Sequence, residues 1–553
     1  MVLRSEIVRR ILEARGISAA DLESFLNPSL RDLAPPEDLP GLVSAADVVL
    51  DAVAAKKKTV IFGDYDCDGV CATAILVKTL SALGADVEPF LPDRRSEGYG
   101  MSDEAVARML RECPEVGLVI TVDNGINSVQ QVADLRSRGI GVVITDHHLP
   151  GDELPEADAL VDPKVAAPEE FSNLCGAGVA FLLANRLVSE SKRRGTYDGP
   201  SIGGALLVLA GLATVTDLMT LLGQNRILVA EALRRFPVLA PVGLRELHMR
   251  AARSGGDRLT SKDFAFLLGP RINAAGRMAS GMEALELILS DDREITRELA
   301  RIVDGYNVMR KSIEQKMTDE AMSKIVSGAP AQVIDLTGGH PGVVGIVAAR
   351  VLEHLGDEGP VCIIADGHGS ARAPDWLNIR EAFVACSETL SSFGGHAAAA
   401  GFAVKEGRLD DFRRLLCEYC TTHRGERVST ERAVDAWVDA SDITLELADD
   451  LTLLEPFGEG NQEPVFGLRD VFFSDVKPLG IDGRHLAASL RGSGLRLVFW
   501  NRGDLVEPLR ASGASPHTIR FRVVASGYGE RHVELRLVSV DRRIESNDSL
   551  CRR

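Results

Sequence analysis

The chain lacks a surplus of positive charge. Its 553 residues contain 62 Lys and Arg against 80 Asp and Glu, which gives a formal charge of −18. This balance argues against a protein that binds nucleic acid by general electrostatic attraction, so nucleic-acid binding would need a local basic groove inside an acidic shell. The charge is unevenly distributed along the chain. Residues 466–553 contain 15 basic and 10 acidic residues, a net charge of +5, so the remaining residues carry a net charge of −23.

Other absences narrow the class of protein further. The nine cysteines have no regular spacing, which indicates reduced thiols and a cytoplasmic protein rather than a disulfide framework. The first residues, "MVLRSEIVRRILEARG", are typical of an amphipathic helix and not of a signal peptide. The uncharged run 201–216 is short for a membrane span, is rich in Gly and Thr, and meets Asp217 at once, so we expect a buried helix and no membrane association.

The pattern of apolar residues predicts an α/β protein. Residues 1–55 are typical of a helical N-terminal arm. From residue 56 to about 280, short apolar runs alternate with helical patterns, which predicts a parallel sheet with right-handed crossovers. The expected strands lie at 59–62, 117–121 and 141–145, and the expected helices between them at 70–84 and 128–139.

The second half of the chain predicts three more parts. Residues 281–328 form a charged helical pattern with few breakers, which we interpret as one long connecting helix. A second α/β lobe is expected at 329–428. Residues 429–545 contain about five strand patterns without a long helix pattern between them, which favours a small β-barrel such as an OB-fold, followed by a tail at 546–553.

Acidic residues and histidines follow three of the predicted strands, in "GDYDCDG" (63–69), "VDNG" and "DHH". In parallel sheets, ligands lie at the carboxyl ends of the strands, so these side chains should meet at one edge. Carboxylates suit divalent cations, and an added histidine shifts the preference toward Mn²⁺ or another transition metal over Mg²⁺ or Ca²⁺. The candidate ligands are Asp64, Asp66, Asp68, Asp123, His147 and Asp217, with Asp146 and His148 adjacent.

So many ligands are too many for one ion. Two ions about 3.5–4 Å apart that share a carboxylate would use them, and such a pair suits hydrolysis of a phosphoester. Taken singly, each motif also fits an ordinary turn or a helix cap; the combination carries the prediction. Asp217 is the weakest candidate from spacing, although a lone aspartate after an uncharged run is costly unless it is paired or bound to metal.

The motifs "GDYDCDG", "TVDNG", "TDHH" and "LATVTD" resemble, in order, those of the DHH phosphoesterase superfamily. Downstream, "GPRINAAGRM", "GGHPGVVGIVAARV", "GSARA" and "FGGHAAAAGF" resemble the DHH-associated domain of the RecJ family, and "PFGEGNQEPVF" resembles the start of its OB domain. The resemblance covers nearly the whole chain, including "FLNPSL" in the arm. It implies a single-stranded-DNA-specific exonuclease that degrades 5′→3′ to 5′-mononucleotides and acts in DNA recombination and repair.

The resemblance also implies roles for single residues. Two divalent ions, Mn²⁺ preferred or Mg²⁺, would be held by Asp66, Asp68, Asp123, His147 and Asp217, with Asp123 bridging them. Asp64 and Asp146 would orient these ligands. His148 would contact the scissile phosphate or assist the leaving group. The implied catalytic residues are Asp64, Asp123, His147 and His148.

A pocket for the 5′ phosphate is implied at Arg94, Arg277, Ser370, Arg372 and His396, and it would fix the polarity of degradation. Arginine suits this task because its paired donors match phosphate geometry. Two points depart from the family pattern. Arg95 follows Arg94 directly, so the choice between them stays open. Gly339 stands before "HPG" where the family usually has an aromatic residue, whose loss something else must replace.

Two alternatives stay open. One is a DHH-family phosphodiesterase acting on short oligonucleotides or cyclic dinucleotides, and the other is a non-catalytic single-strand-binding replication scaffold. Against the second, none of the proposed metal ligands is missing. The resemblance further implies a monomer that binds single-stranded DNA and works with single-strand-binding protein and a repair helicase. Base stacking in the barrel could use some of a few aromatic residues, others of which we expect in the core: Phe472, Phe473, Phe499, Trp500 and Tyr528.

Overall fold

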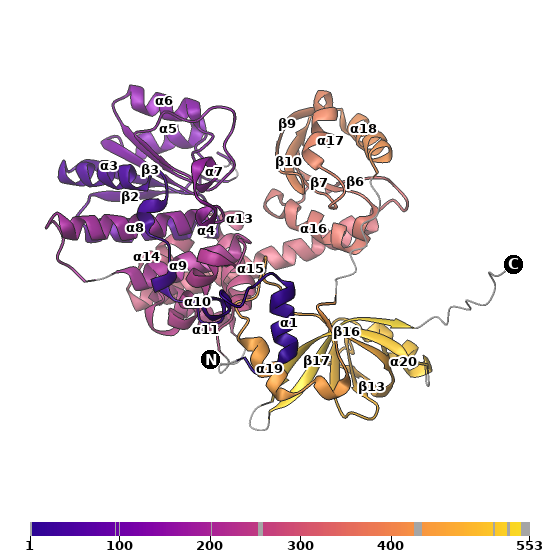
Figure 1. Cartoon of the computed structure of the whole chain (residues 1–553). Coiled ribbons are helices and arrows are strands. Elements are labelled where there is room, and N and C mark those ends of the chain that lie inside the picture. The colour runs from indigo at the N-terminus through magenta and orange to yellow at the C-terminus, as the bar shows by residue number, and fades with distance from the viewer. Residues whose placement is uncertain are drawn as a thin grey trace.

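The computed structural model describes residues 3–94, 96–98, 100–200, 202–252, 258–424, 434–512, 515–527 and 531–542. Two α/β lobes are joined by the long helix α15 (Arg293–Ser323), and a β-barrel at the C-terminal end lies beside both the helix and the first lobe (Figure 1). The fold class predicted from the sequence is therefore confirmed. Tyr528, Arg95 and the predicted tail lie outside the described residues.

The first lobe contains a five-stranded parallel sheet in the order β2-β1-β3-β4-β5. Because β2 lies on one side of β1 and all later strands lie on the other, the order reverses between β1 and β3. Such a switch point is where doubly wound sheets bind ligands. The strands are β1 (Lys58–Phe62), β2 (Val87–Phe90), β3 (Val116–Val122), β4 (Gly141–Thr145) and β5 (Ala159–Val161).

Helices cover both faces of this sheet, since its strands are apolar on both sides. Ile61 and Ile120 pack against α3, α4, α8 and α9, whereas Val60 and Phe62 pack against α5 and α6. The helices of this lobe are α3 (Leu42–Ala54), α4 (Cys67–Ala82), α5 (Asp103–Glu112), α6 (Val129–Ser137), α7 (Pro163–Ala166), α8 (Gly176–Arg193) and α9 (Gly203–Thr216). As predicted, α9 is a buried helix that ends at Asp217. No helix within the described ranges has the length and apolarity that crossing a membrane needs.

A helical layer follows the first lobe. The predicted single helix over 281–328 is wrong, because the chain forms two helices there. Asp292 starts the second one, since its side chain accepts hydrogen bonds from the backbone N–H groups of Glu294 and Ile295. The helices of this layer are α10 (Gly223–Leu239), α11 (Val242–Ala251), α12 (Ser261–Asp263), the π-helix η4 (Phe264–Leu268), α13 (Gly269–Met278), α14 (Met282–Leu289) and α15.

The second lobe is a mixed five-stranded sheet in the order β6-β7-β8-β10-β9, in which only β6 and β7 pair parallel. α15 and α16 cover one face, and α17 and α18 cover the other. Its elements are β6 (Gln332–Asp335), the 3₁₀ turn η5 (Pro341–Val343), α16 (Val344–Leu355), β7 (Val361–Ala365), β8 (His368–Arg372), α17 (Ile379–Ala385), β9 (Leu390–Gly395), β10 (Ala399–Val404) and α18 (Leu409–Thr422).

The C-terminal sheet has the order β11-β12-β16-β17-β15-β14-β13. β12 and β13 are separated in sequence by Phe472 alone, so they act as one bent strand that closes five strands into a barrel, as predicted. The short β11 pairs outside it, and α20 precedes β16. The elements are β11 (Ala436–Trp437), α19 (Leu445–Thr452), β12 (Phe466–Val471), β13 (Phe473–Leu479), β14 (His485–Leu490), β15 (Arg496–Phe499), α20 (Val506–Ser512), β16 (His517–Ser526) and β17 (His532–Arg542).

The N-terminal arm is shared between two parts of the molecule. Its helices α1 (Glu6–Ala14) and α2 (Leu22–Leu26) contribute Val8, Ile11, Leu12 and Phe25 to the core of the C-terminal domain. α3, which the sequence also places in the arm, packs instead in the core of the first lobe. The arm therefore links the barrel to the first lobe.

Candidate metal centre and phosphate pocket

The predicted strand ends converge at the switch point of the first sheet. Asp64 follows β1, Asp123 follows β3, and Asp146 with the two histidines follows β4. Asp123 has a φ of +61°, a left-handed conformation that short polar residues tolerate. It lies against the first residue of α8, where a Cβ added to Gly176 would come within 2.6 Å of the Asp123 Cβ. Gly176 therefore permits this close approach.

Two further carboxylates are held by helix N-termini. Asp66 caps α4, and its Oδ1 accepts hydrogen bonds from the backbone N–H groups of Asp68 and Gly69, both at 3.0 Å. The two carboxylate oxygens of Asp68 accept from the first two N–H groups of α8, those of Gly176 at 2.7 Å and Ala177 at 2.8 Å. The positive ends of both helices thus stabilise negative charge at the site.

His147 lies at the centre of the cluster. Its Nε2 is 3.0 Å from Asp123 Oδ1, 3.6 Å from Asp68 Oδ2 and 3.7 Å from Asp217 Oδ2. Asp217, the weakest candidate from spacing, is therefore brought to the other acids by the end of α9. Burial lowers the pKa of His147, which favours the neutral imidazole that binds metals.

The site offers three overlapping groups of ligand atoms, each within 4.8 Å: Asp64 with Asp66 and Asp123, Asp123 with His147 and His148, and Asp68 with His147 and Asp217. Asp123 and His147 each belong to two groups. A set of groups that share members can hold two ions with a bridging carboxylate, whereas a single ion would leave several acids unused.

The electrostatics also fit cations. Burial and the neighbouring carboxylates raise the pKa of Asp64 and of Asp123 well above the usual range, and they raise the pKa of Asp217 to about 9. Oδ1 of Asp64 and Oδ2 of Asp217 are buried oxygens without a hydrogen-bond partner in the described structure. Buried, unpartnered carboxylate oxygens are costly, and divalent ions would satisfy them.

Asp146 orients the DHH segment. Its Oδ1 accepts from the backbone N–H of His147 at 2.7 Å and lies 2.8 Å from His148 Nδ1, while Oδ2 accepts from the N–H of Ile126 at 2.9 Å. Burial opposes the charge of Asp146, but the bond with His148 outweighs it and lowers the Asp146 pKa. Burial likewise lowers the pKa of His148, yet Asp146 raises it to about 9. The His148 side chain is 33% exposed, so it can reach a substrate.

Two arginines lie beside residues 63–69, which we call the metal loop. The guanidinium carbon of Arg94 is 5.1 Å from the centroid of the Tyr65 ring, between Asp64 and Asp66 in sequence. Arg277, on α13, donates from Nη1 to the carbonyl of Gly342 in the second lobe at 3.0 Å. Burial, and then repulsion by Arg94, lowers the pKa of Arg277 to about 10. Two cations this close favour an anion between them.

Ser370 and Arg372 face the same junction from the second lobe. Arg372 Nη1 donates to Ser370 Oγ at 3.1 Å, and burial lowers the Arg372 pKa. Gly345, in the first turn of α16, lies against both, because a Cβ built on it would be 3.0 Å from Arg372 Nη2 and 3.1 Å from Ser370 Oγ. The "GGHPGVVG" segment therefore contacts Arg277 at Gly342 and the pair on β8 at Gly345.

His396 and Gly339 need separate mention. His396 lies in the exposed turn between β9 and β10, where its backbone N–H donates to Ala399 O at 2.8 Å, and no described contact joins its side chain to Arg372. At Gly339, an added Cβ would lie 2.8 Å from Met317 Cε. Met317 Cε and the carbonyl oxygen of Leu336, 2.9 Å from the same Cβ, thus leave little room for a side chain at this position.

Sequence reasoning missed two residues near the site. Asp162 follows β5 and lies within the electrostatic reach of Asp146 and His148; burial raises its pKa to about 7. It could have been found as the acid at the end of a fourth strand pattern, "ALV". Asn273, on α13, accepts from the backbone N–H of Cys67 at 2.7 Å and so fixes the metal loop. Asn273 and Cys67 are 206 residues apart in sequence, so only the folded chain brings them together.

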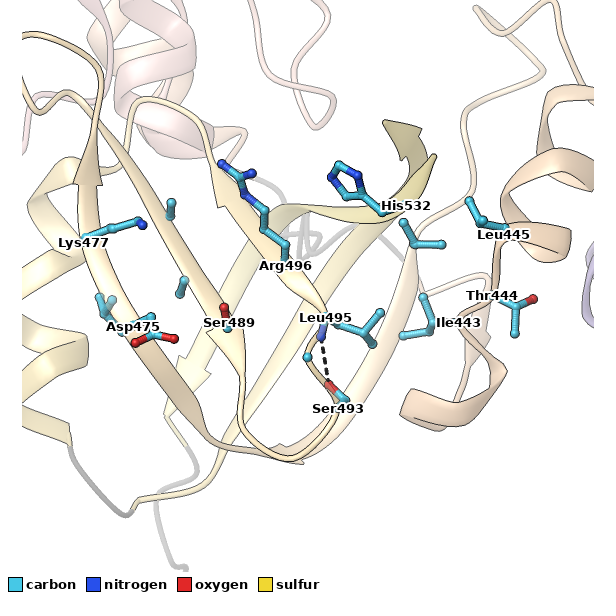
Figure 2. A pocket seen from close by; sticks show the side chains of 15 residues that line it. Ile443, Thr444, Leu445, Asp475, Lys477, Ser489, Ser493, Leu495, Arg496 and His532 are labelled. Carbon is cyan, nitrogen blue, oxygen red and sulfur yellow. Dashed lines mark hydrogen bonds between the residues drawn. The ribbon is translucent and has the colours of Figure 1, made fainter. Parts of the chain in front are cut away.

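The barrel carries a groove of about 890 Å³ across β13, β14, β15 and the start of β17 (Figure 2). Exposed Lys477, Arg496 and His532 line it, with Asp475 as the acidic residue in its lining. Among the described residues, no aromatic ring of Phe, Tyr or Trp lines it. Phe473 and Phe499 belong to the core, Phe472 is half-buried, and Trp500 is exposed with its ring edge-on to His485.

Family models of known proteins match all three parts of this chain, the two lobes and the barrel. The DHH family, N-terminal domain, matches residues 58–219; the DHHA1 domain matches 328–422; and the RecJ OB domain matches 434–539. The single-stranded-DNA-specific exonuclease RecJ of Thermus thermophilus is 37% identical over 480 residues, which cover 86% of this chain and 68% of the relative. The chain belongs to the RecJ family. The RecJ of Dickeya dadantii is 35% identical, over 83% of both chains.

The RecJ of Bacillus subtilis is 34% identical over 91% of this chain, which spans 64% of that relative's length. Among solved structures, RecJ from Thermus thermophilus in complex with Mn²⁺ superposes with a TM-score of 0.84 at 32% identity, over 97% of this chain and 76% of that one. The same RecJ with Mg²⁺ gives a TM-score of 0.78. The RecJ likeness thus extends over lobes and barrel together.

Proposed function

We propose that this protein is a single-stranded-DNA-specific exonuclease that degrades its substrate 5′→3′ to 5′-mononucleotides. The observation that carries the proposal is a pair of neighbouring sites: shared metal-ligand groups on the first lobe, and a junction of half-buried arginines contributed by both lobes. The RecJ relatives, which bear the name of this activity, support it.

Five residues would hold two divalent ions, Mn²⁺ or Mg²⁺: Asp66, Asp68, Asp123, His147 and Asp217. When bound, such a pair lowers the pKa of a water molecule and neutralises charge that develops on the phosphate. Asp123 would bridge the ions, because it belongs to two ligand groups. Asp64, whose Oδ1 is unpartnered in the described structure, would complete or orient the ligand set.

Residues around the ions would then position the substrate. Asp146 holds the His148 ring through Nδ1, and the partly exposed ring would contact the scissile phosphate or the leaving oxygen. The side chains of Arg94, Arg277, Ser370 and Arg372 would bind the 5′ phosphate, and His396 would join them if its turn closes over the strand. A terminal phosphate held at a fixed distance from the metals sets both polarity and product length.

The barrel groove would hold the rest of the strand. It lies on the face that OB-folds use for oligonucleotides, and its Lys477, Arg496 and His532 suit phosphates. The chain's acidic exterior would repel DNA elsewhere, so the strand is directed to these local basic surfaces. Because stacking platforms do not line the described groove, we expect backbone contacts to dominate there.

The wider setting is also a proposal. From the motif resemblance alone, we propose that the protein acts as a cytoplasmic monomer in DNA recombination and repair. Its partners would be single-strand-binding protein and a helicase that opens the duplex.

A direct test uses single-stranded DNA labelled at its 3′ end, incubated with protein and Mn²⁺, with Asp123→Ala as the control. Progressive shortening from the 5′ end, absent in the variant, is the expected result. Companion substrates are a 5′-hydroxyl strand, a blunt duplex and a cyclic dinucleotide. Rapid turnover of the cyclic dinucleotide without DNA cleavage would instead assign a different phosphodiesterase activity, and strand binding without any turnover would indicate a scaffold.

A further inference from the structure

Within the described structure, Arg226 is a buried cation without an acidic partner. It lies on α10 and is only 2% exposed. Its guanidinium donates to three backbone carbonyls: Nε to Phe25 at 2.8 Å, Nη1 to Leu454 at 3.1 Å and Nη2 to Glu455 at 2.9 Å. Burial lowers its pKa to about 10, so it stays charged at neutral pH. Burying a charge costs free energy unless hydrogen bonds compensate for the lost solvation, so the contacts of this side chain indicate what it does.

The three carbonyls come from two other parts of the molecule. Phe25 lies in α2 of the arm, and its ring stacks 3.7 Å from the guanidinium carbon. Leu454 and Glu455 follow α19 and lead into the barrel. One side chain therefore joins the helical layer of the first lobe, the arm and the C-terminal domain. The planar fork of arginine reaches the three acceptors from three different nitrogens, whereas a lysine would have to reach all three from its single ammonium nitrogen.

We call residues 454–463 the docking segment, because further contacts join it to the first lobe. The backbone N–H of Leu221 donates to Glu459 O at 2.8 Å, and Ser261 Oγ donates to Phe457 O at 2.5 Å. Leu221 belongs to the short loop that runs from Asp217 to α10. The docking segment therefore rests on the same loop that begins with a metal-ligand candidate.

We infer that Arg226 is a positioning residue that fixes the barrel groove relative to the metal centre. The inference rests on the proposed function. A strand bound at both the groove and the terminal-phosphate pocket gains affinity only if the two sites keep a fixed separation, because the second contact then forms at a high effective concentration. Loosening the docking segment would remove this gain for long strands and leave short substrates unaffected.

The test compares Arg226→Met and Arg226→Lys with Arg235→Met, a control on the same helix whose partly exposed side chain pairs with Glu231, a buried carboxylate that Arg234 also contacts. Each variant is assayed on a 5′-phosphorylated dinucleotide and on a strand of about 50 nucleotides, well beyond the roughly 4–16 that an OB-fold covers. We expect the long-strand KM of Arg226→Met to rise about tenfold, an effect of about 1.4 kcal/mol. Its kcat and its dinucleotide kinetics should not change.

Arg226→Lys should give an intermediate KM, and Arg235→Met should match the wild type. An unchanged long-strand KM in folded Arg226→Met would overturn the inference, as would an equal loss on both substrates, which would indicate damage to the metal centre. If Arg226→Met does not fold, Phe25→Leu, which removes only the stacked ring, decides by the same comparison. Failure of the proposed function is distinct, because the wild type would then not shorten the long strand, whether or not it hydrolyses the dinucleotide.

Discussion

Replacing Arg372 with methionine should abolish the preference for a 5′-phosphorylated strand. Arg372 is half-buried, and burial lowers its pKa because the charge loses solvation, which a bound anion would compensate. Nη1 already donates to Ser370 Oγ and to the carbonyl of Ala371 at 2.8 Å, which leaves the remainder of the guanidinium for the phosphate. A hydrogen bond to a charged group contributes about 1.5–3 kcal/mol, so its loss should lower kcat/KM about 10–150-fold.

The assay measures initial rates of nucleotide release from two strands of the same sequence, one with a 5′ phosphate and one with a 5′ hydroxyl. Arg372→Met should lower kcat/KM for the phosphorylated strand by the factor above and for the hydroxyl strand less than about threefold. Arg380→Met, an exposed change on α17, is the control and should alter neither. An equal loss on both strands would refute the assignment, because Arg372 would then act on folding or on the metals.

Three further predictions concern the metal centre. Asp123→Asn should lower hydrolysis about a thousandfold or more while strand binding persists in a gel-shift assay, since shared metal coordination is worth several kcal/mol; a modest loss would contradict bridging. In EDTA-treated protein, the Asp217 pKa is raised from 3.8 to about 9, so its contribution to stability is present below about pH 4 and is lost as pH rises toward 9. The melting temperature of this metal-free protein should therefore fall over that pH range. Asp217→Asn should reduce the dependence of the melting temperature on pH. Gly176→Ala should destabilise the fold by about 1–3 kcal/mol and reduce activity, because its Cβ would meet Asp123. Gly305→Ala is the control and should do neither, because its Cβ meets nothing within the described structure. Equal melting temperatures for Gly176→Ala and the wild type would contradict this crowding.

Much of the metal centre could be predicted from sequence because its ligands sit next to strand patterns. Asp64, Asp123 and His147 each follow an apolar run, and parallel strands end at one edge whatever the details of packing. Asp217 follows a long uncharged helical run instead of a strand pattern, so its spacing alone did not place it at the sheet edge. Its place beside His147 depends on how α9 packs, which local pattern does not specify.

Other features depend on contacts between distant parts of the chain. The bond from Arg277 to Gly342, which joins the lobes, and the capping of the metal loop by Asn273 have no local signal. The break between α14 and α15 was missed because a charged pattern hides the cap at Asp292. His396 shows the opposite case: a motif names it, but the structure leaves its side chain in an exposed turn.

The split arm has a consequence for how the chain folds during synthesis. α1 emerges long before the barrel, yet its apolar residues complete the core of the barrel, and the backbone N–H of Ser5 donates to Asp450 Oδ2, 445 residues later. At about 5–20 residues per second, roughly 20–90 seconds pass before α1 meets its partner. Over that time the first lobe can fold around α3, while the apolar residues of α1, Val8, Ile11 and Leu12, lack the barrel core that buries them in the folded protein and are open to chaperones on the nascent chain.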